Sequence, residues 1–249
     1  AAHRSESRSM KKVFYYKNEL TDDFAGTDIK RKPLSENHKY FTKNPIRHFF
    51  AFLFYRIIAT PIGSLFNFIA YRMRIVGKGK LRKYSKEGYF LYGNHTLIPG
   101  DAFTPTMVAF PKKAHIIVNP DAVSIPVVGA ITPMLGAVPL PSTIDATRNF
   151  LAYMKDCVDT GKVVTIYPEA HIWPYYNDIR KFRDASFTYP IKLKVPTVAA
   201  VTIYRQRKIF KNLPPLSTVY VSQPRMPEEY TTRAELCEKV YNFMKETVD

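Results

Sequence analysis

From residue 73 onward the chain alternates short apolar runs with longer stretches of mixed polarity, and this alternation constrains the fold more than any other feature. Short apolar runs bounded by turn residues are typical of buried strands, and longer mixed stretches are typical of helices. Strands that alternate with helices form a mostly parallel central sheet covered by helices, so the sequence predicts an α/β domain over residues 72–249. The predicted strands are 73–77, 88–93, 114–118, 136–140, 162–167, 197–204 and 218–222, and the predicted helices are 101–109, 122–134, 143–159, 181–194 and 231–247.

A strongly apolar and aromatic segment precedes this domain, at residues 48–71. A helix that crosses a membrane needs about 20 apolar residues with few charges. Here Arg56 lies within the run, and Pro61 and Gly63 interrupt it. We therefore expect two short helices joined by a bend, which lie in the membrane interface as an N-terminal anchor and do not cross the bilayer. The alternative is a helical hairpin buried against the domain.

The net charge of +16 indicates an anionic partner, such as nucleic acid, a membrane surface, an acidic carrier protein or a phosphate substrate. A nucleic-acid-binding protein would be expected to interleave basic residues with exposed aromatics or to carry a known binding motif. Neither pattern is present, so we expect a lipid bilayer as partner and no nucleic acid. The cations instead flank the apolar segment: Lys43, Arg47, Arg72, Arg74, Lys78, Lys80, Arg82 and Lys83.

The first residues and the cysteines add less. Residues 1–9 resemble a cloning remnant ahead of Met10, and residues 10–47 read as a polar arm, either extended or in short helices. Cys157 and Cys237 are far apart and show no C-x-x-C spacing. This pattern favours neither a disulfide nor a zinc site and fits a reducing cytosol.

A histidine and a carboxylate follow the second predicted strand, as His95 and Asp101. Pro99 and Gly100 predict a turn between them. An imidazole oriented by a carboxylate can act as a general base that removes a proton from a substrate hydroxyl, and an unperturbed imidazole with a pKa of about 6.5 suits this task at neutral pH. The alternative is that His95 only caps a turn.

The sequence around this pair resembles the glycerolipid acyltransferase family, typified by the 1-acylglycerol-3-phosphate acyltransferases, which carry the motif N-H-x-x-x-x-D. Asn94 and His95 match, but five residues separate His95 from Asp101 where the family has four. We expect Gly100 to absorb the extra residue in a bulge or wider turn, because glycine accepts unusual backbone angles.

Three later blocks extend this resemblance over residues 75 to 205. Residues 166–169 (IYPE) resemble the start of F-P-E-G-T-R, residues 181–187 (KFRDASF) resemble K-F-K-x-G-x-F, and residues 195–201 (VPTVAAV) resemble V-P-I-V-P-V. The order and spacing of the blocks are also similar to those of the family.

The resemblance implies a membrane-associated O-acyltransferase of phospholipid biosynthesis. It would move a fatty acyl group from acyl-CoA or acyl-carrier protein to a hydroxyl of a lysophospholipid, without a metal or bound cofactor. His95 would be the general base and Asp101 the residue that orients it. The expected substrate-binding residues are Asn94, Glu169, Lys181 and Arg183 in the matching blocks, together with Arg148, which does not match a family motif. Glu169 can also be interpreted as a strand-end carboxylate that pairs with Arg180 or Lys181. The expected location is the cytoplasmic face of the cell membrane, as a peripheral or monotopic protein.

Two arginines that bind the acceptor phosphate in the family are absent. Ser142 and Ile172 occupy their positions, and Arg148 is a possible substitute on a predicted helix. Arginine binds phosphate through paired hydrogen bonds that serine and isoleucine cannot make. The alternatives are therefore an acyltransferase for a different lysolipid or a glycolipid, or a catalytically degenerate lipid-binding protein. Convergence of His95, Asp101 and Glu169 in one cleft beside residues 48–71 would favour the enzyme.

Overall fold

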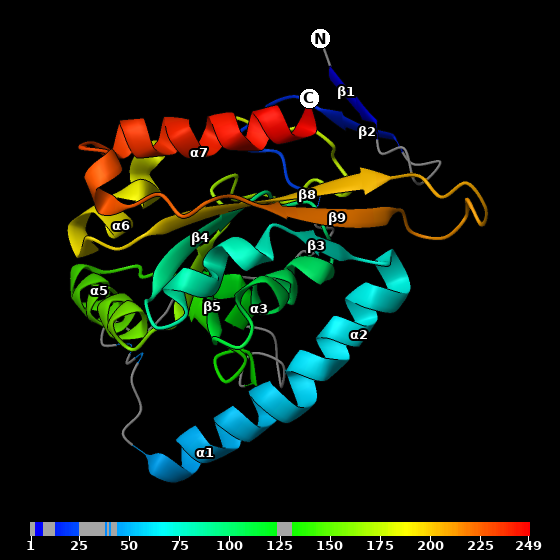
Figure 1. Ribbon diagram of the computed structural model, residues 1–249. Helices are drawn as coiled ribbons and strands as arrows, with labels where there is room; N and C mark the ends of the chain where they lie inside the picture. The colour runs from blue at the N-terminus through cyan, green and yellow to red at the C-terminus, as the bar shows by residue number, and fades with distance from the viewer. Residues whose placement is uncertain (1–2, 7–12, 25–37, 39, 41–43, 124–130) are drawn as a thin grey trace.

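The computed structural model describes residues 3–6, 13–24, 38, 40, 44–123 and 131–249. Its centre is a seven-stranded sheet in the order β3-β9-β8-β4-β7-β5-β6 (Figure 1). Neighbouring strands run parallel, except that β8 and β9 are antiparallel. The predicted mostly parallel sheet is confirmed, and each strand lies where the sequence places it: β3 (Arg74–Val76), β4 (Tyr89–Gly93), β5 (Ala114–Val118), β6 (Ala137–Pro139), β7 (Val163–Ile166), β8 (Thr197–Arg205) and β9 (Leu216–Val221).

The helices of the domain follow the prediction with local differences. Residues 101–109 divide into a 3-10 turn (Gly100–Ala102) and α3 (Thr104–Ala109), and residues 181–194 form a helix only after another 3-10 turn at Asp184–Phe187. Residues 124–130 of the predicted helix 122–134 lie outside the described part of the chain. The other helices are α5 (Ile144–Asp159), α6 (Thr188–Leu193) and α7 (Arg233–Val248), with further 3-10 turns at Lys78–Tyr84, Pro120–Val123 and Pro227–Glu229.

The centre of the sheet is buried on both faces, as β4 illustrates. Phe90 and Tyr92 belong to the core that includes residues of α5 and α7, whereas Tyr89 and Leu91 belong to the core that includes residues of α2 and α3. Helices α7 and α3 lie on opposite sides of the sheet (Figure 1). Burying an apolar side chain of this size contributes about 1.5–3 kcal/mol. Continuous burial explains why this strand reads as an unbroken apolar run.

Residues 45–71 form one continuous helical run. The two predicted helices are present as α1 (Pro45–Leu53) and α2 (Thr60–Tyr71), but a π-helical turn (Phe54–Ala59) joins them where the sequence predicts a bend. Inside an α-helix a proline loses a backbone hydrogen bond and clashes with the preceding turn. Here Pro61 lies two residues after the end of the π turn, whose wider ring is closed by the bond from Thr60 N to Tyr55 O. The wider turn lets the helix continue past Pro61.

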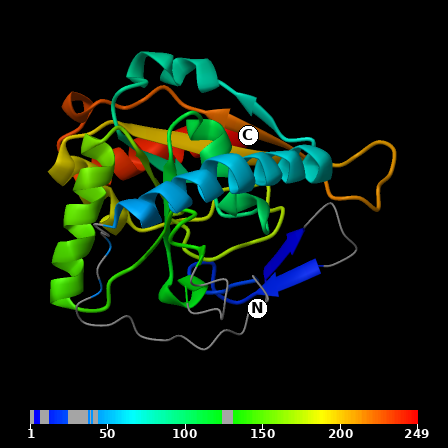
Figure 2. The ribbon, with the colours of Figure 1, turned by 90° about the horizontal axis from the view of Figure 1, so that it is seen from below.

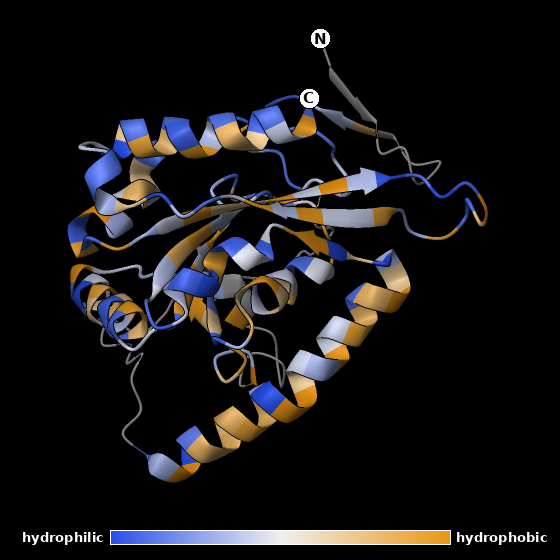
Figure 3. Cartoon of the chain, in the orientation of Figure 1, coloured by the Kyte–Doolittle hydropathy of each residue, from blue (hydrophilic) through white to orange (hydrophobic). Residues whose placement is uncertain are grey.

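The helix of residues 45–71 packs on the domain along one face only. The Tyr55 hydroxyl lies 2.8 Å from Thr106 Oγ1 on α3 and accepts a bond from Ala114 N of β5 (3.0 Å). At Gly63, a Cβ atom would lie 2.2 Å from the ring of Phe103, so glycine allows this close approach. The opposite face is apolar and exposed (Figure 3), and its side chains include Phe49, Phe52, Ile57, Ile62, Leu65, Phe68 and Ile69. By length and composition the helix of 27 residues could cross a membrane.

The N-terminal residues lie beside the domain. β1 (His3–Glu6) pairs antiparallel with β2 (Val13–Tyr16), and residues 17–24 follow without a helix. Residues 25–37 of the predicted arm lie outside the described residues.

His115, buried in β5, is expected to make stability depend on pH. Burial lowers the pKa of His115 well below its usual value, and the charges of Lys113 and Lys162 lower it further. Below about pH 6.5 the His115 side chain is therefore protonated in the unfolded chain but stays neutral in the folded protein. The free energy of unfolding should be highest above that pH and fall as the pH decreases, by up to about 1.4 kcal/mol per unit. Urea unfolding at several pH values should show a shallower decline for His115→Gln, and an identical decline would contradict this assignment.

Candidate active site

The predicted site residues lie at the carboxyl ends of two adjacent parallel strands. In β4 and β7, Tyr92 pairs with Ile166, so His95 and Glu169 each follow three residues beyond this pair. The carboxyl ends of parallel strands are where α/β sheets bind ligands. The strand register thus brings two blocks that are distant in sequence to one place.

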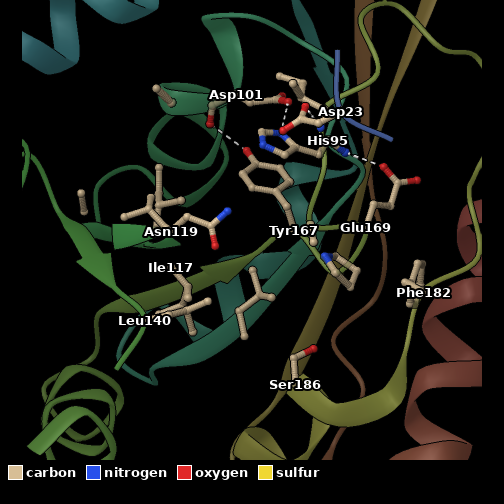
Figure 4. A pocket seen from close by; sticks show the side chains of 18 of the residues that line it. Asp23, His95, Asp101, Ile117, Asn119, Leu140, Tyr167, Glu169, Phe182 and Ser186 are labelled. Carbon is tan, nitrogen blue, oxygen red and sulfur yellow. Dashed lines mark hydrogen bonds and ion pairs between the residues drawn. The ribbon is translucent and has the colours of Figure 1, made fainter. Parts of the chain in front are cut away.

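His95 and Asp101 form a direct pair (Figure 4). His95 Nδ1 lies 2.9 Å from Asp101 Oδ2, and the same oxygen accepts bonds from Thr96 N and Leu97 N, both at 2.9 Å. Asp101 is buried, whereas the His95 side chain is 26% exposed. Because Nδ1 faces the carboxylate, Nε2 is the ring nitrogen available to a substrate.

The longer loop between His95 and Asp101 closes as a tight turn, in which Asp101 N donates to Leu97 O at 2.7 Å. Gly100 does not have the unusual backbone angle that we expected, because its φ is not positive. Its role is to leave space: a Cβ atom there would lie 2.3 Å from Leu97 Cδ2 and 2.9 Å from Asn67 Oδ1. The loop accommodates its extra residue by packing closely against α2.

Three side chains that the sequence analysis missed hold this loop by its carbonyl oxygens. Tyr71 OH donates to Ile98 O (2.9 Å), Asn67 Nδ2 to Gly100 O (3.3 Å) and Tyr167 OH to Asp101 O (2.7 Å). The Tyr167 ring also stacks on the His95 imidazole, with centroids 4.5 Å apart and planes 14° apart (Figure 4). Only Tyr167 had a signal in the sequence, since it directly precedes Pro168-Glu169 where the family motif has phenylalanine.

Glu169 accepts a hydrogen bond from the backbone of His95 and forms a buried ion pair with Arg180. Its Oε2 accepts from His95 N (2.9 Å) and lies 3.3 Å from Arg180 NH2, and its Oε1 accepts from Arg180 N (3.0 Å). Burial raises the pKa of Glu169, while the Arg180 guanidinium and the two backbone N–H groups oppose that shift. Of the two expected partners, the structure pairs Glu169 with Arg180. Arg180 in turn lies over the Trp173 ring, 4.7 Å from its centroid.

His95, Asp101 and Glu169 line one cavity of about 1080 Å³. This cavity also reaches Tyr55, Ala59 and Thr60 of the long helix, so the convergence that would favour an enzyme is present. Its polar lining residues include Lys181, Arg183 and Ser186, and its apolar lining residues include Phe103, Ile117, Leu135, Ala137, Leu140 and Phe182. Figure 4 labels Ile117, Leu140, Phe182 and Ser186 among them.

The sequence profile of the family described as Acyltransferase matches residues 72–203, which include every block quoted above. The chain belongs to the acyltransferase family. No curated protein matches the chain. Among solved structures, the acyltransferase is similar to the 1-acyl-sn-glycerophosphate (LPA) acyltransferase PlsC from Thermotoga maritima, with 16% identity and a TM-score of 0.58 over 84% of this chain and 83% of that one. This likeness supports the same α/β fold.

Two residues that we expected to bind substrate do not line the cavity of the acyltransferase. Asn94 is buried, and its side-chain amide makes two hydrogen bonds to the backbone of β8. Its Nδ2 donates to Thr202 O (2.9 Å), and its Oδ1 accepts from Thr202 N (2.7 Å). Arg148 lies on the exposed side of α5, 3.3 Å from Asp145. Asn94 therefore ties β4 to β8, and Arg148 points to solvent because that face of α5 turns away from the sheet.

The N-terminal arm forms part of the cavity wall, which the sequence analysis did not foresee. Leu20, Thr21 and Asp23 line the cavity. The arm is held by bonds from Trp173 Nε1 to Asp22 O (2.8 Å) and from Ile172 N to Asp23 Oδ1 (3.2 Å). The backbone of Ile172, at the position of a family arginine, thus holds the Asp23 carboxylate at the cavity.

Within the described residues, no three His, Cys, Asp or Glu side chains are grouped as a metal site.

Proposed function

We propose that this acyltransferase transfers a fatty acyl group from a thioester to a hydroxyl of a lysophospholipid of the 1-acylglycerol-3-phosphate type. The observation that carries the proposal is the pair of His95 Nδ1 and Asp101 Oδ2, 2.9 Å apart at the edge of a largely apolar cavity. A cavity of about 1080 Å³ is slightly larger than the usual range of about 300–1,000 Å³ for small-molecule sites. It is long enough to extend from the imidazole to the helix of residues 45–71.

In this mechanism, Nε2 of His95 accepts the proton of the acceptor hydroxyl as its oxygen attacks the thioester carbonyl. The tetrahedral intermediate then collapses, the carbon–sulfur bond breaks, and the imidazolium returns the proton to the leaving thiolate. Asp101 fixes the tautomer of His95 and stabilises the imidazolium. Glu169 and Tyr167 hold the His95 backbone and ring, so their proposed role is to position the base.

Lys181 and Arg183 are the cations proposed to bind the acceptor head group, because both line the cavity. Ser142 is exposed and does not line it, and Ile172 contributes no charge. A second candidate acceptor is a lysolipid or glycolipid without a terminal phosphate. The Asp23 carboxylate favours it, because an anion in the wall opposes a phosphate that lies close to it.

The helix of residues 45–71 is proposed to anchor the protein in the membrane interface. Its inner face is bonded to α3 and β5, so a helix that crossed the bilayer would draw these elements into the hydrocarbon. An exposed apolar face with a bonded inner face fits a helix that lies in the interface. Residues 72–249 are the proposed catalytic domain, facing the cytoplasm, where acyl-CoA or acyl-carrier protein would supply the acyl group. The positive charge would attract the acidic carrier protein.

The test is acyl transfer from radiolabelled palmitoyl-CoA and palmitoyl-carrier protein into lysophosphatidate and a panel of other lysolipids and glycolipids. We expect transfer to lysophosphatidate, and we expect Arg183→Gln to raise the KM for this acceptor more than it lowers kcat, since binding of the phosphate is the lost interaction. Exclusive transfer to acceptors without a phosphate would identify the second candidate. No transfer to any acceptor would refute the enzymatic proposal.

A further inference from the structure

The tip of the hairpin between β8 and β9 exposes large apolar side chains. Ile209 is 73% exposed, Phe210 69% and Leu213 46%, and Lys208 and Lys211 beside them are also exposed. The tip projects beyond the sheet, away from both cores (Figure 1). Single apolar residues on a surface need no explanation, but a cluster of them on a projecting turn indicates an interaction site.

The tip has a fixed position relative to the long helix. Arg207 donates from Nε to Pro214 O within the turn (2.7 Å) and from NH2 to Ala70 O at the end of α2 (2.8 Å). In two perpendicular views the tip of the hairpin lies beyond the C-terminal end of α2 (Figures 1 and 2). The tip and the exposed apolar face of the helix are therefore parts of one extended edge of the molecule.

The charge around the tip is positive and suits an anionic partner. Arg205 is exposed at the end of β8, and Arg72 and Arg74 are exposed on the neighbouring edge, where Arg74 pairs with Thr218 of β9. Apolar side chains surrounded by cations match a bilayer with anionic head groups: the apolar groups enter the interface and each cation near the surface adds about 1 kcal/mol.

We propose that the β8–β9 tip is a second membrane contact, which inserts into an anionic bilayer while the helix of residues 45–71 lies along the same surface. The two contacts fix the orientation of the domain on the bilayer. This inference extends the proposed interfacial anchor to a part of the chain outside the matched residues 72–203 and does not depend on the catalytic roles of His95 and Asp101.

The experiment places a tryptophan at the tip. The full-length Phe210→Trp variant is mixed with vesicles of phosphatidylcholine and phosphatidylglycerol whose acyl chains carry bromine, which quenches tryptophan only on contact. The native Trp173 is 1% exposed and supplies a constant background. The matched control is Ile144→Trp, at a residue that is 78% exposed on α5, away from this edge. We expect quenching of the first variant and none of the second.

A second measurement separates the two membrane contacts. Replacing Ile209, Phe210 and Leu213 with serine should weaken vesicle binding at least about tenfold in a sedimentation assay, because three apolar side chains no longer leave water. The triple variant Phe49→Ser/Phe52→Ser/Phe68→Ser tests the contribution of the helix alone to vesicle binding in the same assay. An unquenched Phe210→Trp variant on vesicle-bound protein would overturn the tip contact and leave the helix anchor intact. Failure of the wild type to bind vesicles would overturn both, whereas acyl transfer in detergent would still test the catalytic proposal.

Discussion

Replacing His95 with alanine is expected to lower kcat for acyl transfer by about 10²–10⁴-fold, the contribution of a positioned general base. The variant retains the cavity and its cations, so the KM for the acceptor should change much less than kcat. The fold should also persist, because the His95 side chain is 26% exposed and its removal leaves no large buried void. Acyl transfer with a radiolabelled thioester and thermal unfolding of the same preparation measure both effects.

His171→Ala is the matched control for this prediction. His171 lies two residues from Glu169, and its Nδ1 is 3.5 Å from Asp23 Oδ2, but it does not line the cavity. We expect this variant to keep most of its activity. Asp101→Asn should resemble His95→Ala, since an amide at that position favours the wrong tautomer of the imidazole. Wild-type kcat in either the His95 or the Asp101 variant would refute the proposed mechanism.

The centre of the sheet could be predicted from the sequence because β4, β7 and most of β8 are buried on both faces. A strand such as β4 must be apolar at every position, so it stands out from the helices around it. The proximity of His95 to Glu169 follows from the parallel direction of β4 and β7, because the carboxyl ends of parallel strands lie at the same edge of a sheet. The resemblance to the acyltransferase family is confirmed by the match to residues 72–203.

The roles of single polar side chains could not be predicted in this way. An amide such as that of Asn94 bonds a substrate or a backbone equally well, and only the position of β8 decides between them. Arg148 was assigned to the site from its place on a helix, but the rotation of α5 about its axis turns it to solvent. Asp23, Asn67 and Tyr71 reach the site through contacts between distant segments, which no local pattern records.

The largest effect on stability is expected from Arg180→Met. Arg180 and Glu169 are buried to 1% and 0% side-chain exposure, and Arg180 also bonds Glu19 O and His171 O. Removal of the guanidinium leaves a buried carboxylate without its counter-charge, which costs about 3–5 kcal/mol. Urea unfolding should show this loss. Activity should fall as well, because Glu169 holds the His95 backbone.

The double variant Arg180→Met/Glu169→Gln tests the cause of that loss. An amide in place of the carboxylate removes the uncompensated charge, so the double variant should be more stable than Arg180→Met alone. With Glu169→Gln measured as well, the coupling energy of the pair is the change in the double variant minus the sum of the changes in the two single variants. Arg183→Met is the matched control three residues later, where the side chain is exposed and lines the cavity. It should change the free energy of unfolding by no more than about 0.5 kcal/mol. If Arg180→Met unfolds at the same urea concentration as Arg183→Met, the buried pair does not hold this site together. If only Arg180→Met lowers the stability, Arg180 supports the fold beneath His95, whereas Arg183 is free to contact the substrate.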